Sequence, residues 1–167
     1  MKQIGILSDT HGYLDPAIFE YFKECDEVWH GGDFGRGIAD ALLEFKPLKG
    51  VFGNIDGESI RQIFPEDLLF ACEEVSVFIT HIGGYPGHYE ERVKEILQTQ
   101  QPDLFITGHS HILKIMRDPK LNNLLHINPG AAGRSGFHQV RTMVRMKIDG
   151  KRMYDVEVIE LGKRSSV

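Results

Sequence analysis

Five short apolar runs in this 167-residue chain each end directly in side chains that can bind a metal ion. The residues at these ends are, in order, Asp9 with His11, Asp33, Asn54, His81, and His109 with His111. Amphipathic stretches separate several of the runs, so the pattern predicts strands that alternate with helices. In an open α/β sheet, the carboxyl ends of neighbouring strands face one crevice. We therefore expect these seven side chains to meet at one edge of a sheet.

The expected elements follow from the hydrophobic periodicity. Strands are predicted at 2–8, 28–29, 51–52, 68–71, 75–80 and 104–106, and helices over 16–25, 38–45 and 89–100. After 111 the period becomes two, which predicts strands at 112–117, 124–127, 140–148 and 151–161 with a hairpin turn at Asp149-Gly150. The basic side chains of the 140–148 strand are expected on its solvent face. We expect the second half to form another sheet packed on the first, within one domain spanning 1–167 whose residues 162–167 form a loose tail.

Composition limits the class of protein. With 41 % hydrophobic and 26 % charged residues, the chain is typical of a globular protein in water. No apolar run reaches the roughly 20 residues that a membrane helix needs, and no signal peptide is recognisable, so we expect a cytoplasmic protein without a membrane partner. The net charge of -5 argues against non-specific nucleic-acid binding.

The chemistry of the strand-end residues favours a pair of metal ions. Imidazole, carboxylate and amide oxygen together suit Mn, Fe, Zn or Ni, and the set contains no thiolate. Seven such side chains are too many for one tetrahedral ion, whereas they suit two ions that share a ligand. Two divalent ions and two carboxylates would leave the site cationic, so an anionic substrate could be attracted to an acidic protein.

These motifs, in this order and with these gaps, resemble those of the calcineurin-like metallophosphoesterases, and most closely their compact bacterial and archaeal phosphodiesterase branch. The resemblance rests on Asp9-x-His11, Gly31-Gly32-Asp33, Gly53-Asn54, His81 and Gly108-His109-x-His111, and it extends to about residue 130. It implies an α/β fold with a two-sheet β-sandwich flanked by helices, in four layers αββα. It also implies one metal at Asp9, His11, Asp33 and His111, and a second at Asp33, Asn54, His81 and His109. Asp33 would bridge the ions, with Mn the first choice of metal.

The resemblance implies a binuclear metal-dependent phosphodiesterase that acts on a small-molecule phosphate ester. A hydroxide bridging the ions at Asp33 would attack phosphorus in line, and Asn54 would also face the substrate. Many relatives have a proton-donating His after the Asn, whereas this chain has Ile55 and then Asp56. Because general-acid help is worth about 10²- to 10⁴-fold, its absence favours diesters with good leaving groups.

Several assignments stay open at this stage. His30 could orient a ligand or pack at a strand end, Asp56 could orient Asn54 or shape a turn, and Arg134 could contact phosphate or lie on the surface. The alternative functions are a phosphomonoesterase, a nuclease, or a non-catalytic scaffold resembling the retromer subunit of this fold. Association into a homo-oligomer is also left open.

Overall fold

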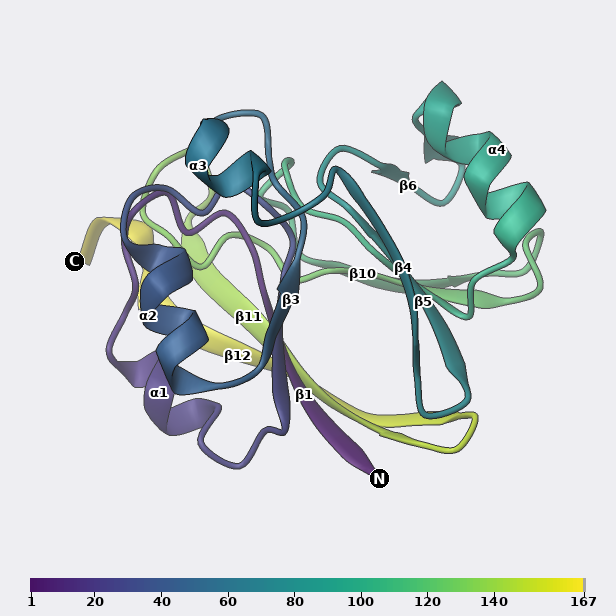
Figure 1. Cartoon of the computed structure of the whole chain (residues 1–167), viewed down its shortest axis with the longest axis horizontal. Helices are drawn as coiled ribbons and strands as arrows, with labels where there is room; N and C mark the ends of the chain where they lie inside the picture. Colours follow the sequence, from purple (N-terminus) through teal and green to yellow (C-terminus); the bar gives the residue numbers. More distant parts are fainter. Residues whose placement is uncertain (167) are drawn as a thin grey trace.

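Two five-stranded sheets form the centre of the computed structural model, which describes residues 1–166 (Figure 1). The first sheet has the order β12-β11-β1-β2-β3. Its strands are β1 (Lys2–Leu7), β2 (Glu27–His30), β3 (Leu48–Gly50), β11 (Val140–Asp149) and β12 (Arg152–Lys163). β1, β2 and β3 are parallel, and the hairpin β11–β12 is joined to them by antiparallel pairing of β11 with β1.

The second sheet has the order β4-β5-β8-β10-β9. Its strands are β4 (Asp67–Cys72), β5 (Val75–Thr80), β8 (Leu104–Ile106), β9 (Lys114–Asp118) and β10 (Leu124–Asn128). The three inner strands β5, β8 and β10 are parallel, whereas β4 and β9 pair antiparallel at the edges. A small hairpin of β6 (Gly84–Tyr85) and β7 (His88–Tyr89) lies apart from both sheets in the pairing.

Helices cover the outer face of each sheet. α1 (Ala17–Tyr21) and α2 (Ile38–Phe45) lie on the side of the first sheet, and α4 (Glu91–Gln100) lies on the side of the second (Figure 1). The short α3 (Glu58–Arg61) and the 3-10 turn η1 (Arg164–Ser166) complete the helical elements of residues 1–166. This confirms the predicted αββα sandwich. None of these helices is long and apolar enough to cross a bilayer.

The periodicity of the strands explains the layers. Alternate side chains of both sheets, including Ile4, Trp29, Ile79, Ile106 and Met146, fill one buried cluster between the sheets. The opposite face of the first sheet packs on the inner stripes of α1 and α2, and that of the second packs on α4. Burial of each side chain of this size stabilises the fold by about 1.5–3 kcal/mol. The packing of these side chains holds the strand ends in fixed positions.

Some sequence predictions are corrected by the structure. The third strand is Leu48–Gly50 rather than 51–52, because its pairing with β2 ends at Gly50 and only the Val51 amide continues the ladder, to His30 O. The hairpin β11–β12 extends the first sheet instead of the second. The predicted tail differs too: residues 162–163 belong to β12 and 164–166 form η1, held by the Arg164 amide donating to Gln139 O. Residue 167 of that tail lies outside the described residues.

Arg141 also departs from its expected place on a solvent face. It is 2 % exposed, and its guanidinium donates to Asp15 Oδ2 at 2.7 Å and to Leu161 O at 2.8 Å. The pairing of β11 with β12 shifts register between Arg141 and Thr142. The extra residue at this shift, Leu161, is on β12, so β11 keeps its alternation and Arg141 shares a face with Met143. Met143 packs in the cluster of the first sheet's helices, so this end of the face is covered by protein and not by solvent, contrary to expectation.

Candidate metal centre

The carboxyl ends of five parallel strands, three from one sheet and two from the other, meet at one place. Asp9 and His11 follow β1, Asp33 follows β2, and Asn54 comes four residues after β3. His81 follows β5, and His109 and His111 follow β8. The structure thus brings together all seven predicted side chains, but from two sheets and not at the edge of one sheet as expected.

Backbone hydrogen bonds tie these strand-end loops to one another. The Asp9 amide donates to Gly32 O at 3.0 Å and the His11 amide donates to Asp33 O at 3.1 Å. The Gly108 amide donates to His81 O at 3.0 Å in the second sheet. The loops therefore continue the ladders of the strands, and the side chains that they carry have little freedom to move apart.

Five of the seven side chains are carried on left-handed backbone. The φ angles are 54° at Asp9, 45° at His11, 59° at Asp33, 71° at His109 and 63° at His111. Each non-glycine residue in this region costs about 1–3 kcal/mol, and such strain clusters at functional sites. Here it turns consecutive strand-end side chains toward one point instead of to opposite faces.

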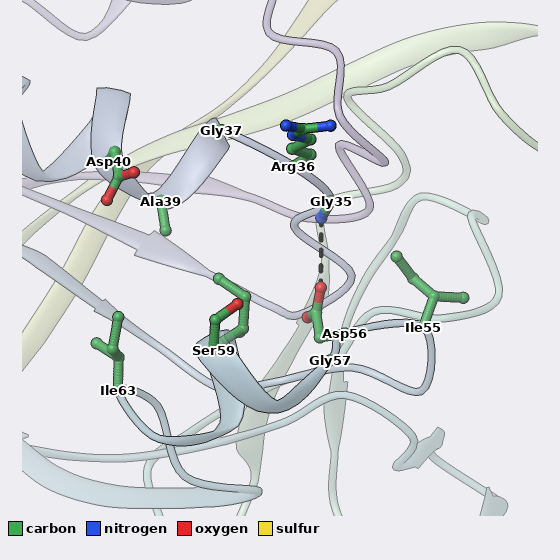
Figure 2. A pocket seen from close by; sticks show the side chains of 11 residues that line it. Gly35, Arg36, Gly37, Ala39, Asp40, Ile55, Asp56, Gly57, Ser59 and Ile63 are labelled. Atoms are coloured by element: carbon green, nitrogen blue, oxygen red, sulfur yellow. Dashed lines mark hydrogen bonds between the residues drawn. The ribbon is translucent and has the colours of Figure 1, made fainter.

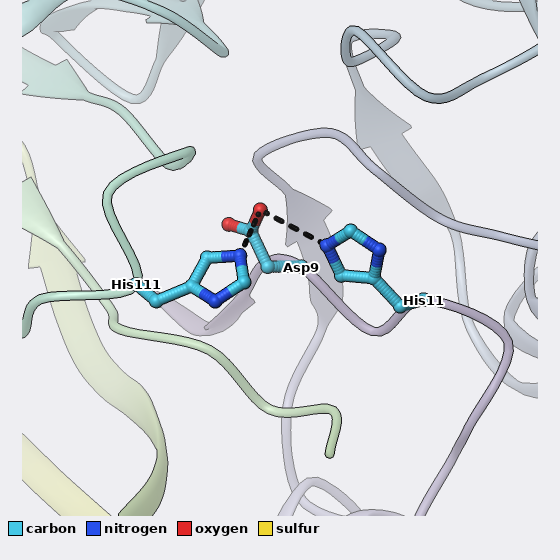
Figure 3. A group of neighbouring side chains, drawn as sticks. All are labelled: Asp9, His11 and His111. Atoms are coloured by element: carbon cyan, nitrogen blue, oxygen red, sulfur yellow. Dashed lines mark ion pairs between the residues drawn. The ribbon is translucent and has the colours of Figure 1, made fainter. Parts of the chain in front are cut away.

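The first donor group contains Asp9, His11 and His111. One ligand atom from each lies within 4.8 Å of the others, and both imidazoles face one carboxylate oxygen (Figure 3). Asp9 Oδ1 is 3.7 Å from His11 Nε2 and 3.2 Å from His111 Nε2. The two rings are arranged edge to face with centroids 5.3 Å apart.

The second donor group contains Asp33, His81 and His109, again with ligand atoms within 4.8 Å of one another. Asn54 belongs to it by position, since its Oδ1 lies 3.0 Å from His81 Nε2 and 3.0 Å from His109 Nδ1. His109 and Asn54 are exposed, whereas Asp33 and His81 are buried. The second group is therefore the more open of the two.

Asp33 connects the two groups. Its Oδ2 lies 3.1 Å from His81 Nε2 in the second group and 3.5 Å from His11 Nε2 in the first. Its other oxygen accepts a hydrogen bond from the Ile55 amide at 2.9 Å, which fixes the plane of the carboxylate. This is the place expected for a shared ligand.

The unsatisfied atoms of the site fit a bound cation. Asp9 Oδ1 and His11 Nε2 are buried and have no hydrogen-bond partner among residues 1–166. The other Asp9 oxygen accepts from Ser8 Oγ at 2.7 Å and from the His109 amide at 3.1 Å. A buried carboxylate oxygen and imidazole nitrogen without partners are costly unless an ion takes both.

The hydrogen bond of His81 also fits. Its Nδ1 lies 2.7 Å from Gly31 O, a carbonyl that can only accept, so Nδ1 carries the proton. Nε2, on the side of Asp33 and Asn54, is then the nitrogen that could bind an ion, which would displace any proton that it shares with Asp33. Metal-binding histidines commonly donate their other ring N–H to a backbone carbonyl in this way.

In each donor group, histidines lower the pKa of the aspartate that they contact. Burial alone raises the pKa of Asp9, but the contacts with His11 and His111 outweigh it and hold this pKa well below its usual range. Burial likewise opposes ionisation of Asp33, and His81 lowers its pKa. The pKa of His11 is raised by Asp9. At neutral pH, both carboxylates are therefore ionised and available to a cation.

Asp56 organises the loops around Asp33. Its Oδ2 accepts hydrogen bonds from the amides of Asp33 at 2.9 Å, Phe34 at 3.2 Å and Gly53 at 2.9 Å. Its Oδ1 accepts from the Gly35 amide at 3.3 Å, the bond that Figure 2 shows. The side chain is 5 % exposed. Of the two interpretations left open, the bonds between Asp56 and Gly53 support the turn, and among the described residues none joins Asp56 to the Asn54 side chain. The bonds to the amides of residues 33–35 give Asp56 a further role in the Asp33 loop.

His30 acts at a greater distance. Its Nδ1 accepts from the Gly32 amide at 3.0 Å, so Nε2 carries the proton and donates to Thr10 Oγ1 at 3.0 Å. Thr10 in turn donates to Phe34 O at 2.7 Å. Burial lowers the pKa of His30 to about 3, so the ring is neutral at pH 7, and it stacks on Phe34. It packs at a strand end and also braces the Asp9-Thr10-His11 turn.

The remaining residues to place are Arg134, which was predicted from the sequence, and three residues near the site that were not. Arg134 is exposed, and its guanidinium lies over the Tyr13 ring at 5.0 Å, so contact with a substrate stays a prediction. The motifs did not indicate Ser8, Thr10 or His138, whose ring lies 5.1 Å from that of His111. For Ser8 and Thr10, adjacency to Asp9 was a local signal. His138 is brought in from a distant loop that the sequence does not place.

Gly53 shows why glycine precedes Asn54. A Cβ atom added there would overlap Oδ1 and the amide nitrogen of Asp33. The backbone of the third strand end therefore approaches the shared carboxylate more closely than any side chain permits.

The chain was compared with known proteins. A model of the calcineurin-like phosphoesterase superfamily domain matches residues 1–151. No curated protein matches the chain. An archaeal phosphodiesterase of known structure has a TM-score of 0.75 and 23 % identity, with 95 % of this chain and 99 % of that chain covered.

Two further solved structures share the fold. Vps29 complexed with Zn²⁺, from Entamoeba histolytica, has a TM-score of 0.72 and 17 % identity, covering 96 % of this chain and 98 % of that chain. A protein from Streptococcus pneumoniae, predicted to be a phosphoesterase, has a TM-score of 0.66 and 20 % identity, covering 95 % and 97 %. At these identities the likeness concerns the fold alone. The match to the superfamily domain, together with the fold, shows that the chain belongs to the calcineurin-like phosphoesterase superfamily.

Proposed function

We propose that this chain is a metal-dependent phosphodiesterase with a binuclear centre. The observation that carries the proposal is the pair of donor groups joined by Asp33. Two divalent ions, with Mn²⁺ the first choice and Fe, Zn or Ni as alternatives, would supply Lewis acidity and a water of lowered pKa. Asp9, His11 and His111 would hold one ion and Asn54, His81 and His109 the other, with Asp33 shared between them.

The protein's own groups would position the reaction. Asp56 and the Ile55 amide hold Asp33 in place, and the exposed Asn54 and His109 stand where a phosphate ester can approach. In hydrolysis, water delivers OH to phosphorus, the bond to the leaving ester oxygen breaks, and that oxygen takes a proton. We propose in-line displacement because it separates the incoming and leaving oxygens on opposite sides of phosphorus.

The residue after Asn54 favours activated diesters. Ile55 is 49 % exposed and cannot donate a proton from its side chain, while its backbone amide is already bonded to Asp33. A leaving group that needs no proton, such as an aryl oxide, should therefore react best.

The direct test compares two substrates with the same leaving group. Purified protein reconstituted with Mn²⁺ should hydrolyse bis(p-nitrophenyl) phosphate with a higher kcat/KM than p-nitrophenyl phosphate. Asp33→Asn should remove this activity, whereas Asp40→Asn, an exposed carboxylate in the cavity beside Asp56, should not. Equal rates on the two substrates, or no hydrolysis with any of the four metals, would overturn the proposal.

A non-catalytic interaction module is the second candidate. It is favoured by the fold shared with Vps29, a protein named for vacuolar sorting. The two candidates differ in one outcome: loss of the seven donor side chains abolishes the function of an enzyme and leaves that of a module intact. A phosphomonoesterase would reverse the substrate preference above, and digestion of nucleic acid would identify a nuclease.

A further inference from the structure

A cavity of about 290 Å³ opens directly beside the second donor group. It lies between the β6–β7 hairpin and the ends of β8 and β10, and His109 forms part of its wall. Ile82 and Ile112, which follow the donors His81 and His111 in the chain, also line the cavity and are 38 % and 62 % exposed. They give the cavity part of its apolar lining.

One lining residue of the cavity is a buried histidine with an unused ring nitrogen. His126 on β10 is 0 % exposed, and neither ring nitrogen has a well-formed hydrogen bond within residues 1–166. Burial lowers its pKa to about 4, so the ring is neutral at pH 7 and has one donor and one acceptor. Its one polar neighbour of note is the Phe105 backbone, which raises the pKa of the ring by accepting from one nitrogen and so leaves the other nitrogen as a free acceptor. Buried polar groups are nearly always satisfied, so an unpaired one that lines a cavity points to a ligand.

The rest of the lining suits an uncharged ring. Besides His126, three aromatic side chains line the cavity: Tyr85, His88 and His109. The charged side chains Lys114 and Glu90 have opposite signs, so the cavity has no net charge from them. Aromatic side chains favour aromatic ligands through offset or edge-to-face contacts.

The two other cavities beside the centre differ in chemistry. One, of about 420 Å³, is lined by Arg36, Asp40 and Asp56 between α2 and α3 (Figure 2). The other, also about 420 Å³, is lined by Asn54 and by four ionic side chains: Arg61, Glu66, Glu90 and Arg92. Both are rich in ionic groups, so an uncharged group is best accommodated beside His109.

We propose that the cavity beside His109 binds one ester group of the phosphodiester, and that this group is an uncharged aromatic or heteroaromatic ring with a hydrogen-bonding atom directed at His126. The inference rests on the proposed function, since it names the substrate class of the same site. It adds a specificity-determining role for Tyr85 and His126.

Inhibition provides the first test. Diphenyl phosphate should inhibit hydrolysis of bis(p-nitrophenyl) phosphate with a Ki at least about tenfold below that of diethyl phosphate. Tyr85→Ala should reduce this ratio to about threefold or less. Tyr21→Ala is the matched control, because Tyr21 lies on α1 and is 41 % exposed against 40 % for Tyr85. An equal Ki for both inhibitors in the wild type, or the same fall in both variants, would overturn the inference.

A second comparison isolates His126. Phenyl 3-hydroxyphenyl phosphate, whose hydroxyl can donate a hydrogen bond to the free ring nitrogen, should inhibit about fivefold more strongly than diphenyl phosphate, the gain of one hydrogen bond. His126→Phe keeps a ring of similar shape and should remove this difference, and His126→Gln should keep part of it. Because a buried substitution can disturb folding, each variant is first checked by its amide NMR spectrum. A difference that persists in a folded His126→Phe variant would contradict the role of this side chain.

Direct binding separates the inference from the proposed function. Diphenyl phosphate added to ¹⁵N-labelled protein should shift the amide signals of Tyr85, Lys114 and His126, and diethyl phosphate should not. If these shifts occur but no ester is hydrolysed, the binding site stands and the enzyme assignment fails. If esters are hydrolysed but the shifts fall around Arg36 or Arg92, the enzyme assignment stands and the cavity assignment fails.

Discussion

Replacing Asp56 by Ala tests how far the site depends on one carboxylate that touches no proposed metal. Three amides donate to Asp56 Oδ2 at 2.9–3.2 Å, and a fourth donates to Oδ1 at 3.3 Å. Leaving a buried donor unsatisfied costs about 1–3 kcal/mol. Because water can solvate some of the four amides in the variant, the penalties do not all add. Asp56→Ala should therefore lower the free energy of unfolding by about 3–6 kcal/mol.

The same change should weaken metal binding. Two of the four amides belong to Asp33 and Gly53, which hold the shared carboxylate and the backbone before Asn54. Loss of a group that orients metal ligands typically costs about 10- to 100-fold in metal affinity. Urea denaturation of the metal-free protein measures the first effect, and competition with a chelator for Mn²⁺ measures the second.

The conservative variant and a control sharpen this test. Asp56→Asn keeps one acceptor oxygen. It should therefore lower the free energy of unfolding by about half as much as Asp56→Ala does. Asp40→Asn, an exposed carboxylate in the same cavity, should change stability by no more than about 0.5 kcal/mol. A loss below about 1 kcal/mol in Asp56→Ala, together with unchanged Mn²⁺ affinity, would refute this reasoning.

Three other changes have defined outcomes. Gly53→Ala should lower the free energy of unfolding, measured in urea, by about 1–3 kcal/mol. Gly57→Ala should not, because a Cβ there meets nothing within 4 Å. Equal effects of the two changes would contradict the close approach of Gly53 to the shared carboxylate. Burial raises the pKa of Asp15, but Arg141 outweighs it and the pKa is lowered in the folded state. The stability that wild type has over Asp15→Asn should thus be present at pH 7 and fade as the pH falls through the folded pKa, and a difference that persists in strong acid would be inconsistent. Mn²⁺ at 100 times its Kd should stabilise the wild type by about 2.7 kcal/mol, seen as a raised Tm that Asp9→Asn removes; an unchanged Tm in the wild type would argue against binding.

The convergence of the seven side chains was predictable because it depends on local patterns. Each strand is a short apolar run, each polar residue stands at its end, and parallel strands place their ends together. The prediction held even at Asn54, although the strand before it is Leu48–Gly50 and not 51–52. The Val51 amide still donates to His30 O at 3.3 Å, which continues the path of the strand toward the site.

The features that the sequence did not reveal depend on contacts between distant segments. The alternation over 140–148 predicted a strand and its partner, but not that β11 would pair with β1. The burial of Arg141 follows from the helices that cover its face of β11 and from Asp15, 126 residues earlier in the chain. The cavity beside His109 likewise needs the β6–β7 hairpin and β10, which no local pattern brings together.

The left-handed backbone of five donor residues could not be predicted from the sequence either. Asp and His adopt this conformation more readily than most residues, yet they do so in a small fraction of cases. Only the hydrogen bonds between the loops, such as the His11 amide to Asp33 O, impose it. The identity of the residues was therefore visible in the sequence, and their orientation was not.

The most direct test of the binuclear centre is the number of Mn²⁺ ions that each chain binds, measured by elemental analysis after reconstitution and removal of free metal. The two donor groups predict two ions per wild-type chain. Because Asp33 contributes to both groups, Asp33→Ala should retain fewer than one ion per chain while it remains folded. A single ion in the wild type, or two ions retained in Asp33→Ala, would contradict a centre built around a shared Asp33.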